Sequence, residues 1–119
     1  MCRLDFQFAD DFQEESVILV SLDEEGVALL ISILENFEQN VKTIECIDES
    51  NNKLVIEPSE NMYSEIKILQ KNKTLWKIPR VKASESLNIL RGMMATSRPC
   101  HNYLTIDTPT KTLVFSKNE

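Results

Sequence analysis

The sequence has few glycines and prolines and a single histidine. Its 119 residues include 2 Gly, 4 Pro and 1 His. With two glycines in all, neither the G-x-G-x-x-G turn that binds dinucleotides nor the glycine-rich loop that holds phosphates can be written. The glycines and prolines are scattered, so no long flexible linker or low-complexity tract divides the chain. We therefore expect one domain over residues 1–119 and no cofactor.

Cysteine is also scarce, with Cys2, Cys46 and Cys100 at wide spacings. No C-x-x-C or H-x-x-x-H pair is present to nucleate a zinc site, so we expect no metal. An odd number of cysteines without a secretion signal favours reduced thiols. Cys100 precedes His101, but neighbours on a strand point to opposite faces, whereas a thiolate nucleophile needs its base within hydrogen-bond reach. We predict no catalytic residue and no enzyme activity.

Long apolar runs are missing as well. The longest, over residues 27–34 and interrupted by Ser32, is far shorter than the roughly 20 residues that a membrane-spanning helix needs. The start, MCRLDFQFADD, turns acidic within five residues, unlike the basic and then apolar order of a signal peptide. These two features predict a cytoplasmic protein with no membrane partner.

The patterns that are present predict an α+β domain. Apolar alternation predicts a strand over residues 4–8, and the β-branched run 17–20 predicts a central strand. Ser21 and Glu24 have the spacing of a capping box for a helix over about residues 22–38. Four short strands follow from residue 41, a second helix begins near Ser84, and a hairpin ends the chain. The predicted order is ββαββββαββ, a largely antiparallel sheet of about eight strands with two helices packed on it, and no internal repeat is visible.

Charge is unevenly distributed along the chain. The net charge is -6 and the pI is about 4.8. Residues 1–62 carry fifteen acidic residues against three basic ones, and residues 63–119 carry four against ten, which are balances of -12 and +6. If the two halves interleave in one sheet, these charges partly neutralise each other. If they do not, the surface has an acidic pole, which attracts basic proteins by electrostatic steering.

A basic segment forms the opposite feature. It combines Trp76, an aromatic side chain that can stack on a base, with Lys67, Lys71, Lys73, Lys77, Arg80 and Lys82. The acidic pI argues against nucleic acid as the main partner.

The strand-to-helix opening VILVSLDEEGVALLISILENFE and the acidic loops beside it resemble the immunity proteins of bacterial toxin–immunity pairs, including those of contact-dependent inhibition systems. This resemblance covers about a third of the chain. It implies a stoichiometric inhibitor that binds a cognate, basic toxin domain, often a nuclease, as a monomer in a 1:1 complex. Such an inhibitor covers the active site or the substrate-binding surface of the toxin.

The acidic segment after the first strand is the predicted contact surface. Exposed ion pairs contribute only about 0–1 kcal/mol each, so tight binding also needs a buried anchor. Phe12 is the candidate anchor, and a core position for it is an equally good interpretation. The predicted acidic contacts are Asp10, Asp11, Glu14 and Glu15, with Glu35 and Glu38 near the end of the first helix as second choices.

Three other functions stay open at this stage. An acidic type III secretion chaperone dimerises and masks an effector segment. A phage-type inhibitor that mimics nucleic acid is physically almost the same object as an immunity protein. Carboxylates are plentiful, so a small hydrolase with an unrecognised site is a further alternative.

Overall fold

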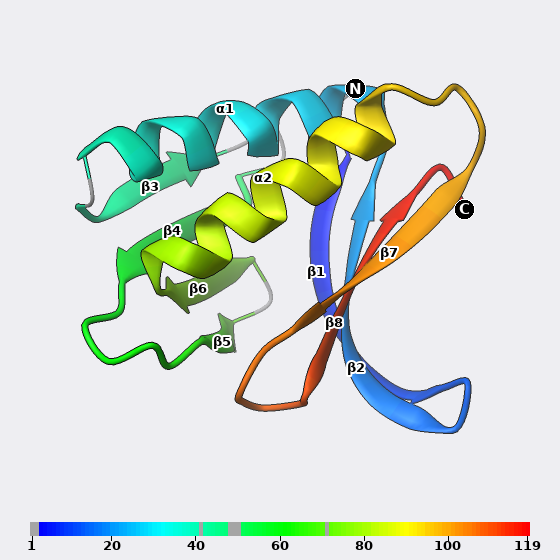
Figure 1. Ribbon diagram of the computed structural model, residues 1–119. Coiled ribbons are helices and arrows are strands. Elements are labelled where there is room, and N and C mark those ends of the chain that lie inside the picture. Colours follow the sequence, from blue (N-terminus) through cyan, green and yellow to red (C-terminus); the bar gives the residue numbers. More distant parts are fainter. Residues whose placement is uncertain (1–2, 41, 48–50, 71) are drawn as a thin grey trace.

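The computed structural model describes residues 3–40, 42–47, 51–70 and 72–119, with the side chain of residue 70 left out (Figure 1). The described residues form eight strands and two helices in the predicted order, so the α+β class is confirmed. The elements are β1 (Leu4–Phe12), β2 (Glu15–Leu22), α1 (Glu24–Asn40), β3 (Ile44–Ile47), β4 (Lys53–Pro58), β5 (Glu65–Gln70), β6 (Lys73–Ile78), α2 (Arg80–Met94), β7 (Cys100–Thr105) and β8 (Thr112–Lys117).

The strands form two four-stranded sheets, which corrects the expectation of one largely antiparallel sheet. The first sheet has the order β1-β2-β8-β7 and the second the order β3-β4-β6-β5. In each sheet two antiparallel hairpins meet at a central parallel pair, β2 with β8 and β4 with β6. Hairpin signals are local in the sequence, but parallel pairing joins distant strands and leaves no local signal.

The topology contains a repeat that the sequence does not reveal. Residues 4–58 and 65–117 each follow the order ββαββ, and each half contributes one hairpin to each sheet. When each strand is replaced by its counterpart in the other half of the chain, the order β1-β2-β8-β7 of the first sheet becomes β5-β6-β4-β3, which is the order of the second sheet. The acidic half and the basic half of the chain are therefore interleaved.

Both helices begin at residues other than those predicted. At α1 the backbone N–H of Gly26 donates to Asp23 Oδ1 at 2.7 Å, so Asp23 caps the helix in place of Ser21, which belongs to β2. At α2 the helix begins at Arg80, directly after Pro79. Ser84 lies inside this helix. A proline at a helix start loses no backbone bond, because the first N–H groups of a helix have no partner within it.

The two helices pack against each other on one side of the sheets (Figure 1). Trp76 is fully buried between them and the strands, with its ring 5.9 Å from that of Phe6 and 6.4 Å from that of Phe115. Trp76 therefore joins the second sheet to the first. This position excludes the base-stacking role expected for it in the basic segment.

A buried lysine closes the end of α2. The side chain of Lys117 has no exposed area, and its Nζ donates to the carbonyl oxygen of Met93 at 2.9 Å and to that of Thr96. Carbonyl groups in the last turn of a helix lack partners within it and carry the negative end of the helix dipole. Lys117 therefore stabilises this end of the helix and adds no positive charge to the surface.

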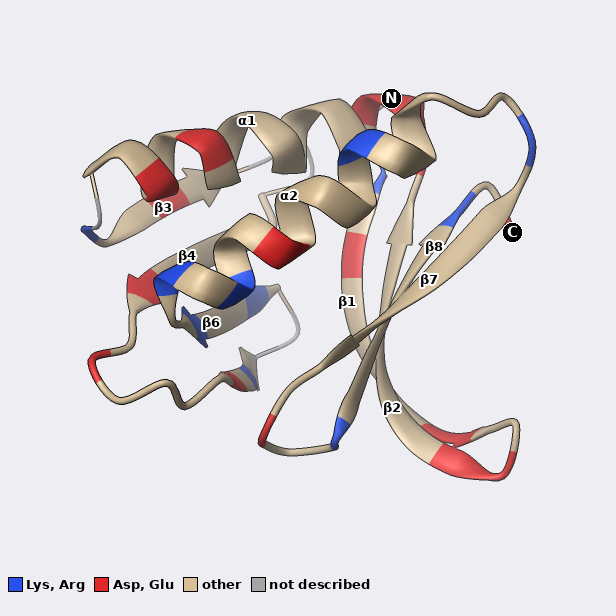
Figure 2. Cartoon of the chain, viewed as in Figure 1, with Lys and Arg blue, Asp and Glu red and all other residues tan. Residues whose placement is uncertain are grey.

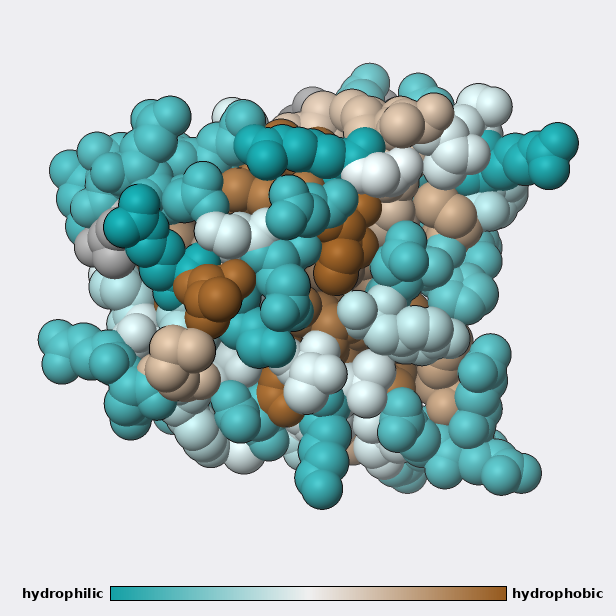
Figure 3. Space-filling view, viewed as in Figure 1, coloured by the Kyte–Doolittle hydropathy of each residue, from teal (hydrophilic) through white to brown (hydrophobic). Residues whose placement is uncertain are grey.

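Most of the face seen in Figure 3 is hydrophilic, with hydrophobic patches near the helices. Within the described part of the chain, neither helix has the length and apolar character needed to cross a membrane.

Candidate protein-binding surface

The predicted acidic residues project from the β1–β2 hairpin, at the lower right in Figure 2. Asp10, Asp11, Glu14 and Glu15 are all exposed. Asp10 Oδ1 accepts a hydrogen bond from Ser16 Oγ at 2.9 Å. Among the described residues, no lysine, arginine or histidine lies within ion-pair distance of any of these four carboxylates. The hairpin is therefore an acidic projection without internal neutralisation.

The tip of this hairpin is strained. Phe12 pairs with Glu15, so the loop consists of only Gln13 and Glu14, whose φ angles are 49° and 69°. A two-residue turn with two positive φ angles strongly favours Asn-Gly. In other residues the Cβ atom comes too close to the following carbonyl oxygen at such angles. Here both positions hold long side chains, so the turn costs stability and brings an exposed carboxylate to the tip.

A β-bulge directs Phe12 away from the main core. Phe6 and Phe8 lie on the face of the first sheet that bears the core, and strict alternation would put Phe12 there too. The register instead shifts between Ala9 and Phe12, so that Phe12 lies opposite Glu15. An extra residue in one strand of a pair re-aims the side chains that follow it. Phe12 thus points to the outer face, and its interpretation as a core residue is wrong.

On the outer face Phe12 belongs to a row of aromatic side chains. Its ring lies 6.5 Å from that of His101, which lies 5.5 Å from that of Tyr103, and both contacts are edge to face. Beneath them Val17 and Val114 have no exposed area, although neither belongs to the main core cluster. The row therefore covers a second, smaller apolar layer, and Tyr103 remains 49% exposed.

A carboxylate holds His101 in place. Glu119 Oε2 lies 2.9 Å from His101 Nδ1, and Glu119 Oε1 accepts from Ser116 Oγ at 2.8 Å. The hydrogen bond from His101 lowers the pKa of Glu119, and the bond from Ser116 adds to this against the opposing effect of partial burial. Cys100 lies on the other side of β7 and packs against the core, as strand alternation predicts. The geometry therefore does not pair this thiol with His101.

Charge is divided between the two sheets. The strands of the first sheet contain a single cation, the buried Lys117, and their acidic residues are Asp5, Asp10, Asp11 and Glu15. The strands of the second sheet carry three glutamates with Lys53, Lys67, Lys73 and Lys77. In that sheet Lys53 pairs with Glu45 at 3.0 Å and Lys67 with Glu65 at 3.8 Å. The acidic pole is thus a property of one sheet and its hairpin, not of one half of the chain.

The second-choice residues lie elsewhere. Glu35 Oε2 pairs with Arg91 Nη2 at 2.9 Å, and Glu38 accepts from Ser84, so both side chains tie α1 to α2. Helix α1, which carries both glutamates, lies away from the β1–β2 hairpin (Figure 2). The structure gathers Asp10, Asp11, Phe12, Glu14 and Glu15 into one surface and leaves these two outside it.

Neither His101 nor Tyr103 is predicted from the sequence to belong to this surface. The period of two in β7 could have placed both on one face. The contact of His101 with Phe12 depends on the bulge, which has no clear sequence signal.

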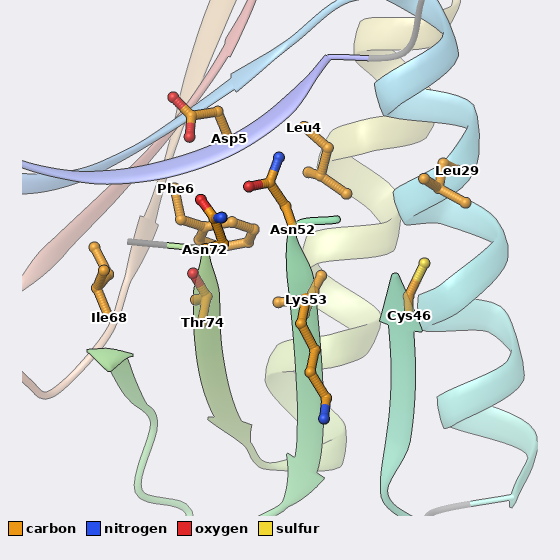
Figure 4. Close-up of a pocket in the computed structure, with 11 residues that line it drawn as sticks. Leu4, Asp5, Phe6, Leu29, Cys46, Asn52, Lys53, Ile68, Asn72 and Thr74 are labelled. Atoms are coloured by element: carbon orange, nitrogen blue, oxygen red, sulfur yellow. The ribbon is translucent and has the colours of Figure 1, made fainter. Parts of the chain in front are cut away.

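Two hollows in the described part of the chain are lined by residues outside this surface. A small cavity of about 40 Å³ lies between Leu4 and Phe6 of β1, Thr74 of β6, and Asn52 and Asn72 at the ends of the neighbouring strands (Figure 4). Small-molecule pockets usually measure about 300–1,000 Å³, so this space suits a few waters. A depression of about 540 Å³ beside α1 and β3 is larger, but it is open.

The described residues contain no group of three or more His, Cys, Asp or Glu side chains arranged to hold a metal ion, and Cys100 is a free thiol. Cys2 lies outside the described residues. Comparison with protein-family models, curated proteins and solved structures gives no match to this chain.

Proposed function

We propose that this protein is a stoichiometric inhibitor that binds a basic bacterial toxin domain through the β1–β2 hairpin. The observation that carries the proposal is the group of four exposed carboxylates at Asp10, Asp11, Glu14 and Glu15, which have no cationic partner among the described residues. Ion pairs neutralise part of the charge on the second sheet, but none does so on this hairpin.

Carboxylates in this arrangement can bind the basic side chains of a partner whose own substrate carries phosphates. The arginines and lysines with which a nuclease holds its substrate form charge-assisted hydrogen bonds with carboxylates as well. An acidic projection also raises the association rate by electrostatic steering, an effect that salt screens. The same charge repels nucleic acid and anionic lipid.

The strain at the tip supports a binding role for the hairpin. Gln13 and Glu14 hold positive φ angles that cost stability, although Asn-Gly would remove most of this cost. Strained backbone persists most often at sites that use it. Here the unfavourable turn places the exposed Glu14 at the tip of an acidic projection.

The test is co-expression with the protein encoded next to this chain, followed by association kinetics. We expect a 1:1 complex, loss of the partner's toxicity, and an on-rate that falls steeply between low and physiological salt. Removal of three charges from the tip, by Asp11→Asn, Glu14→Gln and Glu15→Gln, should lower the on-rate at low salt by about tenfold.

A matched control removes three charges elsewhere. Glu24, Glu25 and Glu60 are exposed and lie off the hairpin, so the triple change to glutamine alters the net charge equally. We expect it to change the on-rate by less than about threefold. Equal effects of the two triple variants, or an on-rate insensitive to salt, would rule out recognition by the hairpin. A stable homodimer of this chain with an apolar groove would instead favour the secretion-chaperone alternative.

A further inference from the structure

We infer that the outer face of the first sheet seats arginine side chains of the partner, with Tyr103 and Phe12 as the stacking surfaces and the hairpin carboxylates as the charged contacts. This inference rests on the proposed function and specifies the chemistry that the partner brings.

The aromatic row is positioned for contact with another protein. The bulge before Phe12 turns its ring to the outer face, beside His101. Val17 and Val114 form a fully buried floor beneath the row, so the rings rest on a packed layer. Tyr103 nevertheless keeps 49% of its surface exposed. Tyrosine is one of the residues in which binding hot spots are enriched.

His101 fixes the spacing of this row. Its ring stands edge-on between Phe12 and Tyr103, and Glu119 holds its Nδ1 at 2.9 Å. Glu119 also accepts from Ser116, so its carboxylate is engaged within the protein. We therefore assign His101 and Glu119 a positioning role and leave the contacts with the partner to their neighbours.

The composition of the surface favours arginine over lysine. Glu15 lies opposite Phe12 and shares its face, while Glu14 is in the two-residue turn and Asp11 precedes Phe12 in the chain. None of these three carboxylates has a cationic partner among the described residues. A guanidinium group stacks flat on an aromatic ring and donates two parallel hydrogen bonds to a carboxylate. The lysine ammonium is a compact, strongly hydrated charge that does neither as well.

Charge also excludes the other occupants of this face. The exposed charged residues on the strands of the first sheet are all acidic, since its only strand cation is the buried Lys117. A second copy docking through the same face would bring like charges together, and an anionic lipid surface or nucleic acid would be repelled. A partner segment rich in arginine is the complementary surface.

Two synthetic peptides of equal length and charge test this inference without the natural partner. One carries six arginines and the other six lysines, each separated by glycine and serine, and isotope-labelled protein is titrated with each at low salt. We expect the arginine peptide to bind about three- to fivefold more tightly, with the largest chemical-shift changes at Phe12, His101 and Tyr103.

Variants separate stacking from charge. Tyr103→Ala and Phe12→Ala should each reduce the arginine preference, and Tyr103→Leu, which keeps apolar volume over the buried valines, should do the same in a folded protein. Tyr63→Ala is the control, because Tyr63 is another exposed tyrosine, 39% accessible, in the loop before β5. The triple hairpin variant should bind both peptides more weakly and leave the ratio of their two affinities unchanged.

Equal affinity for the two peptides, a preference that survives both Tyr103→Leu and Phe12→Ala, or shift changes centred on α1 would overturn the arginine seat. These results leave the proposed function standing, because it depends on the salt-dependent complex and on the hairpin carboxylates, not on the aromatic row. An arginine preference without any salt-dependent partner complex would overturn the proposed function instead.

Discussion

A Cβ atom at Gly26 would lie 1.8 Å from the carbonyl oxygen of Arg3. The first turn of α1 therefore rests directly on the backbone that leads into β1, and only a residue without a side chain fits there. Gly26 does not have a positive φ angle, so close approach and not conformational freedom requires glycine at this position. The contact sets how α1 lies against the first sheet, the sheet that carries the acidic hairpin.

Gly26→Ala should destabilise the fold by about 3 kcal/mol, because the backbone must move to admit a methyl group. Gly92 is the matched control: it lies within α2, and nothing is within 4 Å of a Cβ placed there. Gly92→Ala should therefore stabilise the protein by about 0.5–1 kcal/mol through helix propensity. Urea unfolding measures both changes, and similar values for the two variants would contradict the close approach of α1 to Arg3.

The strained hairpin tip gives a second prediction. Replacing Gln13 and Glu14 by Asn-Gly supplies the residues that tolerate two positive φ angles, so the free energy of unfolding should rise by about 1 kcal/mol. Asp10, Asp11 and Glu15 are retained, so on-rates for a basic partner should fall by only a modest factor. Thermal and urea unfolding check the gain in stability. A loss of stability would mean that the side chains of Gln13 and Glu14 support the native turn.

Local patterns in the sequence were enough to predict the order of the elements. Apolar residues alternate with polar ones around Phe6 and recur every three or four positions around Leu30. Both patterns arise because one face of the element is buried, so they can be read from a single sequence. The partition into two sheets depends on the parallel pairs β2–β8 and β4–β6, whose partners are distant in the chain. No local pattern encodes that pairing, and the topological repeat was missed for the same reason.

The candidate site was predicted in part. The cluster of Asp10, Asp11, Glu14 and Glu15 is visible as composition, and the structure places these residues on one exposed hairpin. The position of Phe12 could not be predicted, because one extra residue at the bulge reverses the face to which it points. The burial of Trp76 could not be predicted either, since nothing in the basic segment distinguishes a buried indole from an exposed one.

Lys117 gives a third prediction. Its replacement by methionine should lower the free energy of unfolding by about 2–3 kcal/mol, because the buried carbonyl group of Met93 and the partly buried one of Thr96 lose the bond from Nζ. Lys111→Met, in the exposed loop between β7 and β8, is the control and should change stability by less than about 0.5 kcal/mol. Chemical denaturation compares the two variants. Lys117→Met as stable as the parent would show that these carbonyl groups find other partners.

Acid should weaken the junction between the β7–β8 loop and the start of β5. Asp107 Oδ2 accepts hydrogen bonds from the backbone N–H of Ser64 at 2.7 Å and from Ser64 Oγ at 3.0 Å. The backbone bond, followed by the hydroxyl bond, lowers the pKa of Asp107 in the folded state. A lowered folded-state pKa means that the unfolded chain takes up this proton first. The contribution is therefore complete above the ordinary aspartate pKa of about 4 and is lost as the pH falls through the lower folded-state value.

Asp107→Asn keeps an oxygen acceptor for Ser64 but removes the charge. The variant should be less stable than the parent at pH 7, and its stability should fall less between pH 5 and pH 2, because one of the groups that binds a proton on unfolding is gone. Urea midpoints across this range measure the difference in slope. Asp11→Asn, an exposed carboxylate without a described hydrogen bond, serves as the comparison and should leave the slope closer to that of the parent. Parallel pH profiles for the parent and Asp107→Asn would show that the Ser64–Asp107 contact does not stabilise the charged form.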